Sequence, residues 1–184
     1  PRFFIGAAAN PFGDPFEWRP YRLAKKVKAG ADFVQTQLIY NVPKFSRWME
    51  EVYDRGLHER VKILAGVGPI KSPAVARYMR DKVPGLDVPN EIVERMEGVG
   101  KGIEDKKARA EAWRKEGMQL CVDIINQVRQ IPGVAGIHIM AIEWEEKVAE
   151  IVEKATELIR KIDAMGGALS AIEAGYYQRE IQEA

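Results

Sequence analysis

The chain has 184 residues, of which 46% are hydrophobic and 30% are charged, a composition typical of one globular domain that is soluble in water. Its net charge of +1 excludes a bulk electrostatic field that would recruit nucleic acid or an anionic membrane. The single cysteine excludes an intrachain disulfide and favours a reducing, cytoplasmic location. No apolar run approaches the roughly 18 residues that a membrane-spanning helix needs.

Strands and helices are predicted to alternate along the chain. In chain order we expect a strand over 3–9, a helix over 17–28, a strand over 33–40, a helix over 42–57, a strand over 61–67, helices over 73–82, 91–99 and 106–130, a strand over 134–141, and one or two helices over 143–184. Because the chain starts at Pro1 and enters a strand almost at once, we expect a trimmed or truncated chain without a signal peptide.

This alternation predicts an α/β fold with a parallel sheet. Four βα units are either a (βα)4 half of a TIM-type (βα)8 barrel or a small open parallel sheet. An extra helix pair precedes the last strand, and a helical tail follows it. In both architectures ligands bind at the carboxyl ends of the strands. We therefore expect Asn10, Gln37, residues 66–69 and the end of HIMAI, residues 138–142, to lie on one functional face.

The predicted strand over 33–40 carries three consecutive polar residues, Gln35, Thr36 and Gln37, between apolar neighbours. A buried amide without a hydrogen-bond partner costs roughly 1–3 kcal/mol. Some of these side chains must therefore face a partner. We predict that Gln37, near the carboxyl end of the strand, faces a ligand.

Several kinds of catalytic and metal site are excluded because the chain lacks the motifs that they require. His58 lies at the amino end of a predicted strand, where residues serve stability, whereas His138 lies mid-strand and faces either the core or a ligand. No histidine pair and no Cys/His cluster has the spacing of metal ligands, so no metal site is predicted. The chain contains no dinucleotide, Walker or nucleophile-elbow motif.

A basic run lies on the first predicted helix, with its members three and four residues apart on the helix surface: Arg19, Arg22, Lys25 and Lys26. Two interpretations stay open. The run is either a solvated outer face, or it reaches over the strand ends and pairs with phosphate oxygens.

Four segments together resemble methylenetetrahydrofolate reductase: FFIGAAANPF, KKVKAGADFVQTQLIYNV, KILAGVGPIKS and GVAGIHIMAIEWEE. The resemblance covers about residues 1–153, in the same order and spacing. It implies an eight-stranded β/α barrel that binds FAD and reduces 5,10-methylenetetrahydrofolate to 5-methyltetrahydrofolate. The segments present correspond to strands five to eight, the second half of that barrel.

The resemblance also implies roles for individual residues. Gln37 corresponds to the glutamine that contacts the pterin of the folate. Asn10 follows the first strand, where some relatives carry an aromatic residue next to the flavin. Ile142 begins Ile142-Glu143-Trp144, where some relatives carry a Leu-x-Arg that contacts substrate, so the arginine of that contact is missing. The positions that contact the phosphates and ribose of the flavin nucleotide fall at Arg19, Arg22, Lys25 and Lys26.

The acidic residues of this family lie in the half of the barrel that is absent here, so the resemblance assigns no catalytic residue to this chain. A fragment of this kind keeps part of the FAD and folate surface and is expected to be inactive alone. Its two open sheet edges are a liability. We therefore expect either a homodimer that completes the barrel or a flattened sheet capped by the tail.

The end of the chain resembles another family. IDAMGGALSAIEAGY and QREI, within about residues 157–184, are similar to the segment after the barrel of methylmalonyl-CoA mutases. We therefore expect two units, 1–153 and 154–184, joined as a chimera or engineered protein, with a natural fusion fragment as the alternative. Two further functional hypotheses stay open: a structural α/β domain with no function of its own, and a piece of an acyl-CoA mutase assembly.

Overall fold

A four-stranded parallel sheet forms the centre of the computed structural model, which describes residues 3–164. The strands stand in chain order, and their bounds are β1 Gly6–Ala9, β2 Phe33–Leu38, β3 Lys62–Val67 and β4 Val134–Ile139. All three strand pairs are parallel. The α/β fold with a parallel sheet is thus confirmed, and within the described residues β1 and β4 are the edges of the sheet.

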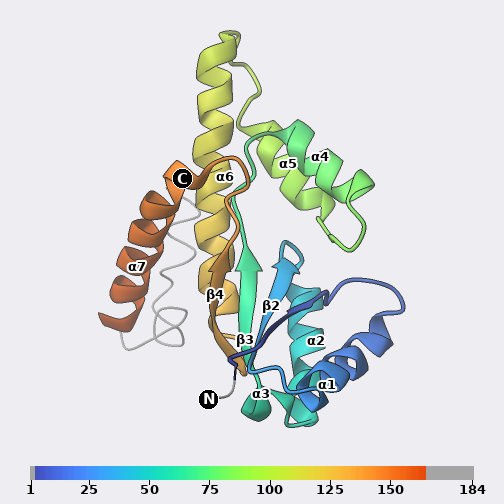
Figure 1. Ribbon diagram of the computed structural model, residues 1–184. Coiled ribbons are helices and arrows are strands. Elements are labelled where there is room, and N and C mark those ends of the chain that lie inside the picture. The colour runs from blue at the N-terminus through green and yellow to red at the C-terminus, as the bar shows by residue number, and fades with distance from the viewer. Residues whose placement is uncertain (1–2, 165–184) are drawn as a thin grey trace.

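Helices connect the strands and pack beside one another (Figure 1). Their bounds are α1 Arg19–Lys28, α2 Val42–Asp54, α3 Leu57–Arg60, α4 Pro73–Lys82, α5 Asn90–Gly98, α6 Lys106–Val128 and α7 Val148–Ala164, with 3-10 turns at Phe16–Trp18 and Glu145–Lys147. Helix α2 packs between α1 and α6, and α6 contacts both β3 and α7. The helices α4 and α5 pack together beyond the carboxyl ends of the strands (Figure 1).

One face of the sheet is closed by the helix layer and the other is open. Side chains alternate between faces along a strand. In β2, Val34 and Leu38 are buried while Gln35, between them, is exposed. In β3, Ile63 is fully buried while its neighbour Leu64 is half-buried. The polar residues of β2 therefore divide between the two sides of the sheet.

Thr36 is the polar residue on the closed face, and it is 3% exposed. The pairing of β2 with β3 shifts register between Gln35 and Leu38. At this shift the Thr36 hydroxyl accepts a hydrogen bond from the backbone N–H of Gly66 at 2.8 Å and donates one to the carbonyl of Gln37 at 2.9 Å. The hydroxyl thus supplies an acceptor for a backbone N–H at the point where the register shift interrupts the ladder of backbone hydrogen bonds. This explains why a threonine is buried here.

Two expected elements have different bounds in the structure. The first strand starts at Gly6 rather than at residue 3, and Phe3 and Phe4 are 88% and 76% exposed. The expected helix over 42–57 divides into α2 and α3, because Gly56 adopts a left-handed conformation with a φ of 61°. His58 consequently lies in α3, at the amino end of β3.

The last described helix, α7, crosses the expected unit boundary between residues 153 and 154 without a break. Most of the mutase-like tail, residues 165–184, lies outside the described residues. Among residues 3–164, no helix combines the length and the apolar composition that crossing a membrane requires.

Candidate functional site

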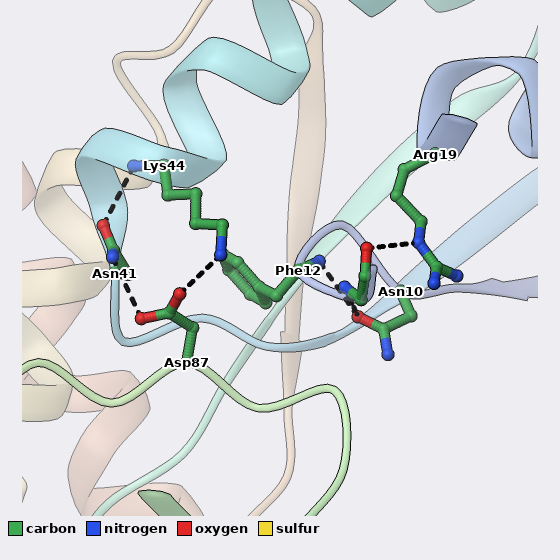
Figure 2. A network of polar contacts seen from close by, with 7 residues as sticks. Asn10, Phe12, Arg19, Asn41, Lys44 and Asp87 are labelled. Carbon is green, nitrogen blue, oxygen red and sulfur yellow. Dashed lines mark hydrogen bonds and ion pairs between the residues drawn. The ribbon is translucent and has the colours of Figure 1, made fainter. Parts of the chain in front are cut away.

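The loop that follows β1 is folded around Asn10. Its side-chain Oδ1 accepts hydrogen bonds from the backbone N–H groups of Phe12 and Gly13, at 3.0 and 3.2 Å (Figure 2). This is the local turn that asparagine side chains favour. Arg19, on the first turn of α1, donates from Nε to the carbonyl of Gly13 at 2.6 Å and from Nη2 to the carbonyl of Asp14. Asn10 and Arg19 therefore hold this loop from both ends.

A second set of contacts fixes the loop between α4 and α5 to the start of α2. Asp87 accepts hydrogen bonds from Lys44 Nζ at 2.7 Å and from Asn41 Nδ2 at 3.0 Å, while Asn41 caps α2 through the backbone N–H of Lys44 (Figure 2). Partial burial acts to raise the pKa of Asp87, but the hydrogen bonds from Lys44 and Asn41 outweigh it, and the pKa lies below its ordinary value.

The two loops meet at a glycine. Gly85 has a φ of 80°, and a Cβ built on it would lie 1.9 Å from Nδ2 of Asn10. A side chain at position 85 would therefore displace Asn10 or strain the backbone. The loop after β1 and the loop between α4 and α5 thus support each other at the carboxyl end of the sheet.

A cavity of about 390 Å³ lies at the carboxyl ends of the strands, and we call it the basic cavity. Its volume falls in the range of small-molecule sites. The strands contribute uncharged polar and imidazole side chains to its lining, and α1 contributes cationic ones: Gln35, Thr36, Gln37 and His138 from the strands, and Arg19, Arg22 and Lys26 from α1. No acidic side chain is among its lining residues within the described part of the chain.

A second cavity, also of about 390 Å³, adjoins the first, and we call it the apolar cavity. Most of its lining comes from hydrophobic and aromatic side chains of α4 and the strand-end loops, including Tyr78, Met79 and Ile142. Gln37 and Met140 line both cavities. The two cavities therefore adjoin each other at Gln37 and Met140.

Gln37 keeps part of its amide available at this junction. Its Oε1 accepts a hydrogen bond from the backbone N–H of Leu38 at 3.0 Å, which fixes the orientation of the side chain. Its amide nitrogen has no partner among the described residues. Gln37 therefore presents a donor to the space between the cavities.

The cations of α1 differ in what they already bind. The Lys26 ammonium donates to the carbonyl of Ala8, and Arg19 is engaged with the loop after β1. Arg22 is exposed and makes no hydrogen bond or ion pair within residues 3–164. Among the lining cations of the basic cavity, Arg22 is thus the one whose donors are all available to a ligand.

Two other titratable groups near the sheet are unsuited to chemistry. Burial raises the pKa of the Tyr40 hydroxyl, which donates to the carbonyl of Gly68 at 3.2 Å. Burial, with a smaller effect of the Asp123 charge, raises the pKa of the Cys121 thiol to about 12. Cys121 is 1% exposed and remains a protonated core residue at neutral pH.

The structure brings together most of the residues that the sequence singled out. Asn10, Arg19, Arg22 and Lys26 line the basic cavity together with Gln37. Two of the predicted residues lie elsewhere. Lys25 is exposed and lines a neighbouring groove with Trp18, and Ile142 is 60% exposed and lines the apolar cavity. The predicted substrate residues Gln37 and Ile142 therefore share the apolar cavity, and the other predicted cofactor residues share the basic one.

Two other residues of the site were not singled out from the sequence. Met140 borders both cavities, and Asp87 ties the loop between α4 and α5 to α2. Met140 comes directly after β4 and two residues beyond His138. Because strand side chains alternate, this spacing indicates that both side chains point to the same side. Asp87 had no such signal, because its partner Lys44 is 43 residues away.

Two family models match the chain. The model of methylenetetrahydrofolate reductase matches residues 1–156, and the model of methylmalonyl-CoA mutase matches residues 129–184. Among curated proteins, methylenetetrahydrofolate reductases 1 and 2 of Schizosaccharomyces pombe are each 28% identical, over 156 and 174 residues, or 83% and 86% of this chain. A probable NADPH-type methylenetetrahydrofolate reductase of Caenorhabditis elegans is 24% identical over 82% of the chain.

The chain spans only about a quarter of the length of these relatives, namely 24%, 26% and 22%. Among solved structures, an uncharacterized protein from Clostridium thermocellum that binds two copies of 5-methyl-5,6,7,8-tetrahydrofolic acid matches with a TM-score of 0.57. That match has 16% sequence identity and covers 85% of this chain and 53% of the other. It establishes a shared fold.

Proposed function

Because the chain belongs to the methylenetetrahydrofolate reductase family, we propose that it forms part of the FAD- and folate-binding face of an enzyme that reduces 5,10-methylenetetrahydrofolate to 5-methyltetrahydrofolate. In this proposal the chain is the half of the barrel that holds ligands. When bound and in its reduced form, the flavin would supply the hydride. The residues of this chain bind and orient the two ligands.

The observation that carries the proposal is the distribution of charged and uncharged side chains around the basic cavity. Neutral amides and an imidazole line its strand side, and the cations of α1 line its helix side, with no acid among the described lining residues. A flavin nucleotide and a folate each join a neutral heterocycle to an anionic group, so both match this distribution. Arg22, Arg19 and Lys26 then face the phosphates of the flavin nucleotide, and Asn10 keeps the loop beside the flavin in place.

The apolar cavity supports a separate place for the folate. Its aromatic and aliphatic lining suits the flat rings of that ligand. Gln37 lies between both cavities, so its free amide nitrogen can donate to a pterin that stacks against a flavin. Ile142 then contacts the substrate through apolar surface alone, without the charge that an arginine would add.

Turnover by this chain alone is expected to be very weak. Reduction of the substrate needs a proton donor near the heterocycle. Neither cavity offers a suitable acid from the strands: within the described residues, Glu143 lines the apolar cavity and is exposed, and the basic cavity has no acid. The chain therefore binds ligands without completing the reaction.

Thermal unfolding in the presence of ligands tests the proposal. A ligand that binds only the folded protein raises its stability, by about 2.7 kcal/mol at a hundredfold excess over Kd. FAD and 5-methyltetrahydrofolate should each raise the midpoint of unfolding, while cobalamin should not. An unchanged midpoint with FAD and with 5-methyltetrahydrofolate would support the alternative of a structural domain without a function of its own.

The proposal includes a homodimer that completes the barrel. Within residues 3–164, β1 and β4 each have one paired neighbour, and the open face between them carries Gln35 and Leu64. Two copies related by a twofold axis could pair β1 of one with β4 of the other and so give eight strands. The molar mass measured by light scattering should then be twice that of the 20.8 kDa chain.

The mutase match favours a second candidate for the end of the chain. It overlaps the reductase match over residues 129–156, which include β4 and the start of α7. The chimera and the boundary at 153/154 remain predictions from the sequence, as does a role in an acyl-CoA mutase assembly. A shift of the unfolding midpoint with a coenzyme A thioester, and none with FAD, would favour this candidate.

A further inference from the structure

His138 has a polar atom that the free protein leaves unpaired. It lies in β4 and lines the basic cavity. Its Nδ1 is shut off from solvent and has no hydrogen-bond partner. The other ring nitrogen, Nε2, also has no partner among the described residues. Because neither ring nitrogen has a partner, His138 contributes no hydrogen bond that stabilises the sheet. Nδ1 has also lost its hydrogen bond to water on being enclosed, which is unfavourable.

Glycines surround the imidazole within the sheet. Gly66, in β3, is the register partner of His138, and Gly136 lies two residues before it on the same face of β4. Neither glycine has a side chain that could cover the ring or bond to it. Met140, two residues further on, lines the same cavity. The neighbours that lie over these glycines are the apolar side chains of Met140, over Gly66, and Leu64, over Gly136, and neither can hydrogen-bond to the imidazole.

The imidazole shares the cavity with two amides. Gln35 and Gln37, in β2, line the cavity with His138, and all three side chains are able to donate and accept hydrogen bonds without a full charge. The cations lie on the α1 side of the cavity. The strand side therefore has the chemistry that recognises the rim of an uncharged heterocycle, where carbonyl oxygens and ring nitrogens alternate.

We propose that His138 determines specificity by hydrogen-bonding, through Nε2, a carbonyl oxygen or ring nitrogen of the planar heterocycle bound in the basic cavity. This inference rests on the proposed function and deepens it, because an isoalloxazine and a pterin share that rim chemistry. Nε2 is the contacting atom because Nδ1 is enclosed. The binding of FAD and of 5-methyltetrahydrofolate, measured separately, distinguishes the two heterocycles.

The test compares His138→Leu, His138→Gln and His138→Asn in the full chain. Loss of a hydrogen bond to the ligand should weaken the affinity of His138→Leu for one of the two ligands by about fivefold or more. The amide nitrogen of glutamine falls near the position of Nε2 and that of asparagine near Nδ1, so His138→Gln should keep more affinity than His138→Asn. The unfolding midpoint of unliganded His138→Leu should not fall, since no hydrogen bond is lost.

His58 provides the matched control. It too has an enclosed Nδ1 without a partner, but its ring stacks on Tyr53 with centroids 4.1 Å apart, and it does not line the cavity. His58→Leu should leave both affinities unchanged. Wild-type affinity for both ligands in His138→Leu would overturn the inference, as would a lowered midpoint with unchanged affinity. A wild-type protein that binds neither ligand would instead overturn the proposed function, and this inference with it.

Discussion

On the closed face of the sheet, Val34 and Ile63 are shut off from water beneath the helices, whereas on the open face Gln35 is exposed and Leu64 is half-buried. The closed face is apolar except for Thr36, whose hydroxyl is fully used within the sheet. The open face is polar where it meets the basic cavity. The difference shows that neighbouring residues of one strand serve separate purposes: Val34 and Leu38 hold the fold, whereas Gln35 and Gln37 line the basic cavity, which Thr36 also borders.

The largest expected effect is on the closed face. Ile63→Ala removes a fully buried side chain and should lower the free energy of unfolding by about 2–5 kcal/mol. Leu64→Ala, one residue along β3 on the open face, should cost less than half of that, because the side chain is only half-buried. Denaturant titration of both variants checks the comparison, and equal costs would show that the two faces do not differ as described.

The next largest effect is on ligand binding. Arg22→Gln removes the cation whose donors are available in the basic cavity, and a charge-assisted hydrogen bond is worth about 1.5–3 kcal/mol. FAD affinity should therefore fall at least about tenfold, with the stability of the free protein unchanged. Lys25→Gln removes the same charge from the same helix but outside the cavity. If both variants weaken FAD equally, the effect comes from net charge rather than from contact.

Thr36 tests the exception on the closed face. Thr36→Val keeps the shape of the side chain but leaves the backbone N–H of Gly66 without its acceptor, which should cost about 1–3 kcal/mol of unfolding free energy. Thr36→Ser keeps the hydroxyl and should restore most of that loss. A valine variant as stable as the wild type would mean that the hydroxyl does not replace the missing ladder bond.

The smallest effect is expected at Asp87. Because its pKa in the folded protein is lowered, its ion pair with Lys44 stabilises the protein above the unfolded pKa of about 3.9 and is lost as pH falls through the folded value. Asp87→Asn should therefore cost less than about 1 kcal/mol at neutral pH and nothing once Asp87 itself is protonated. Unfolding measured from pH 7 down to pH values below the folded pKa of Asp87 checks this, with Glu94→Gln, an exposed carboxylate on α5, as the control. A cost that does not decline as the pH falls through this range would mean that the charge is not its source.

The fold could be predicted largely from local patterns. The helix expected over 73–82 matches α4, which Ser72 caps and Pro73 begins, both residues that favour a helix start. The apolar residues Phe3 and Phe4 misled the prediction of the first strand, because hydrophobicity alone does not say whether a neighbouring strand is present to pair with. One helix was expected over 42–57, and the sequence did not show that a further helical turn, α3, follows Gly56.

The site was less accessible to sequence reasoning, because its contacts join distant parts of the chain. The basic run of α1 appeared as one group, yet the fold gives its members different partners: Arg19 binds the loop after β1, Lys26 binds Ala8, and Arg22 faces the cavity. Asn10 was expected to touch a cofactor, while its Oδ1 is used to form a turn. These outcomes depend on loop geometry, which periodicity does not encode.

An equilibrium titration of the purified chain with FAD, followed by the flavin absorbance and by quenching of flavin fluorescence, tests the central claim most directly. We expect saturable binding of one FAD per chain that weakens as salt rises, because the cations of α1 contribute to it. A titration that gives no binding at low salt would contradict the assignment of the open face to ligand binding, and binding that is insensitive to salt would contradict the role given to Arg22 and its neighbours.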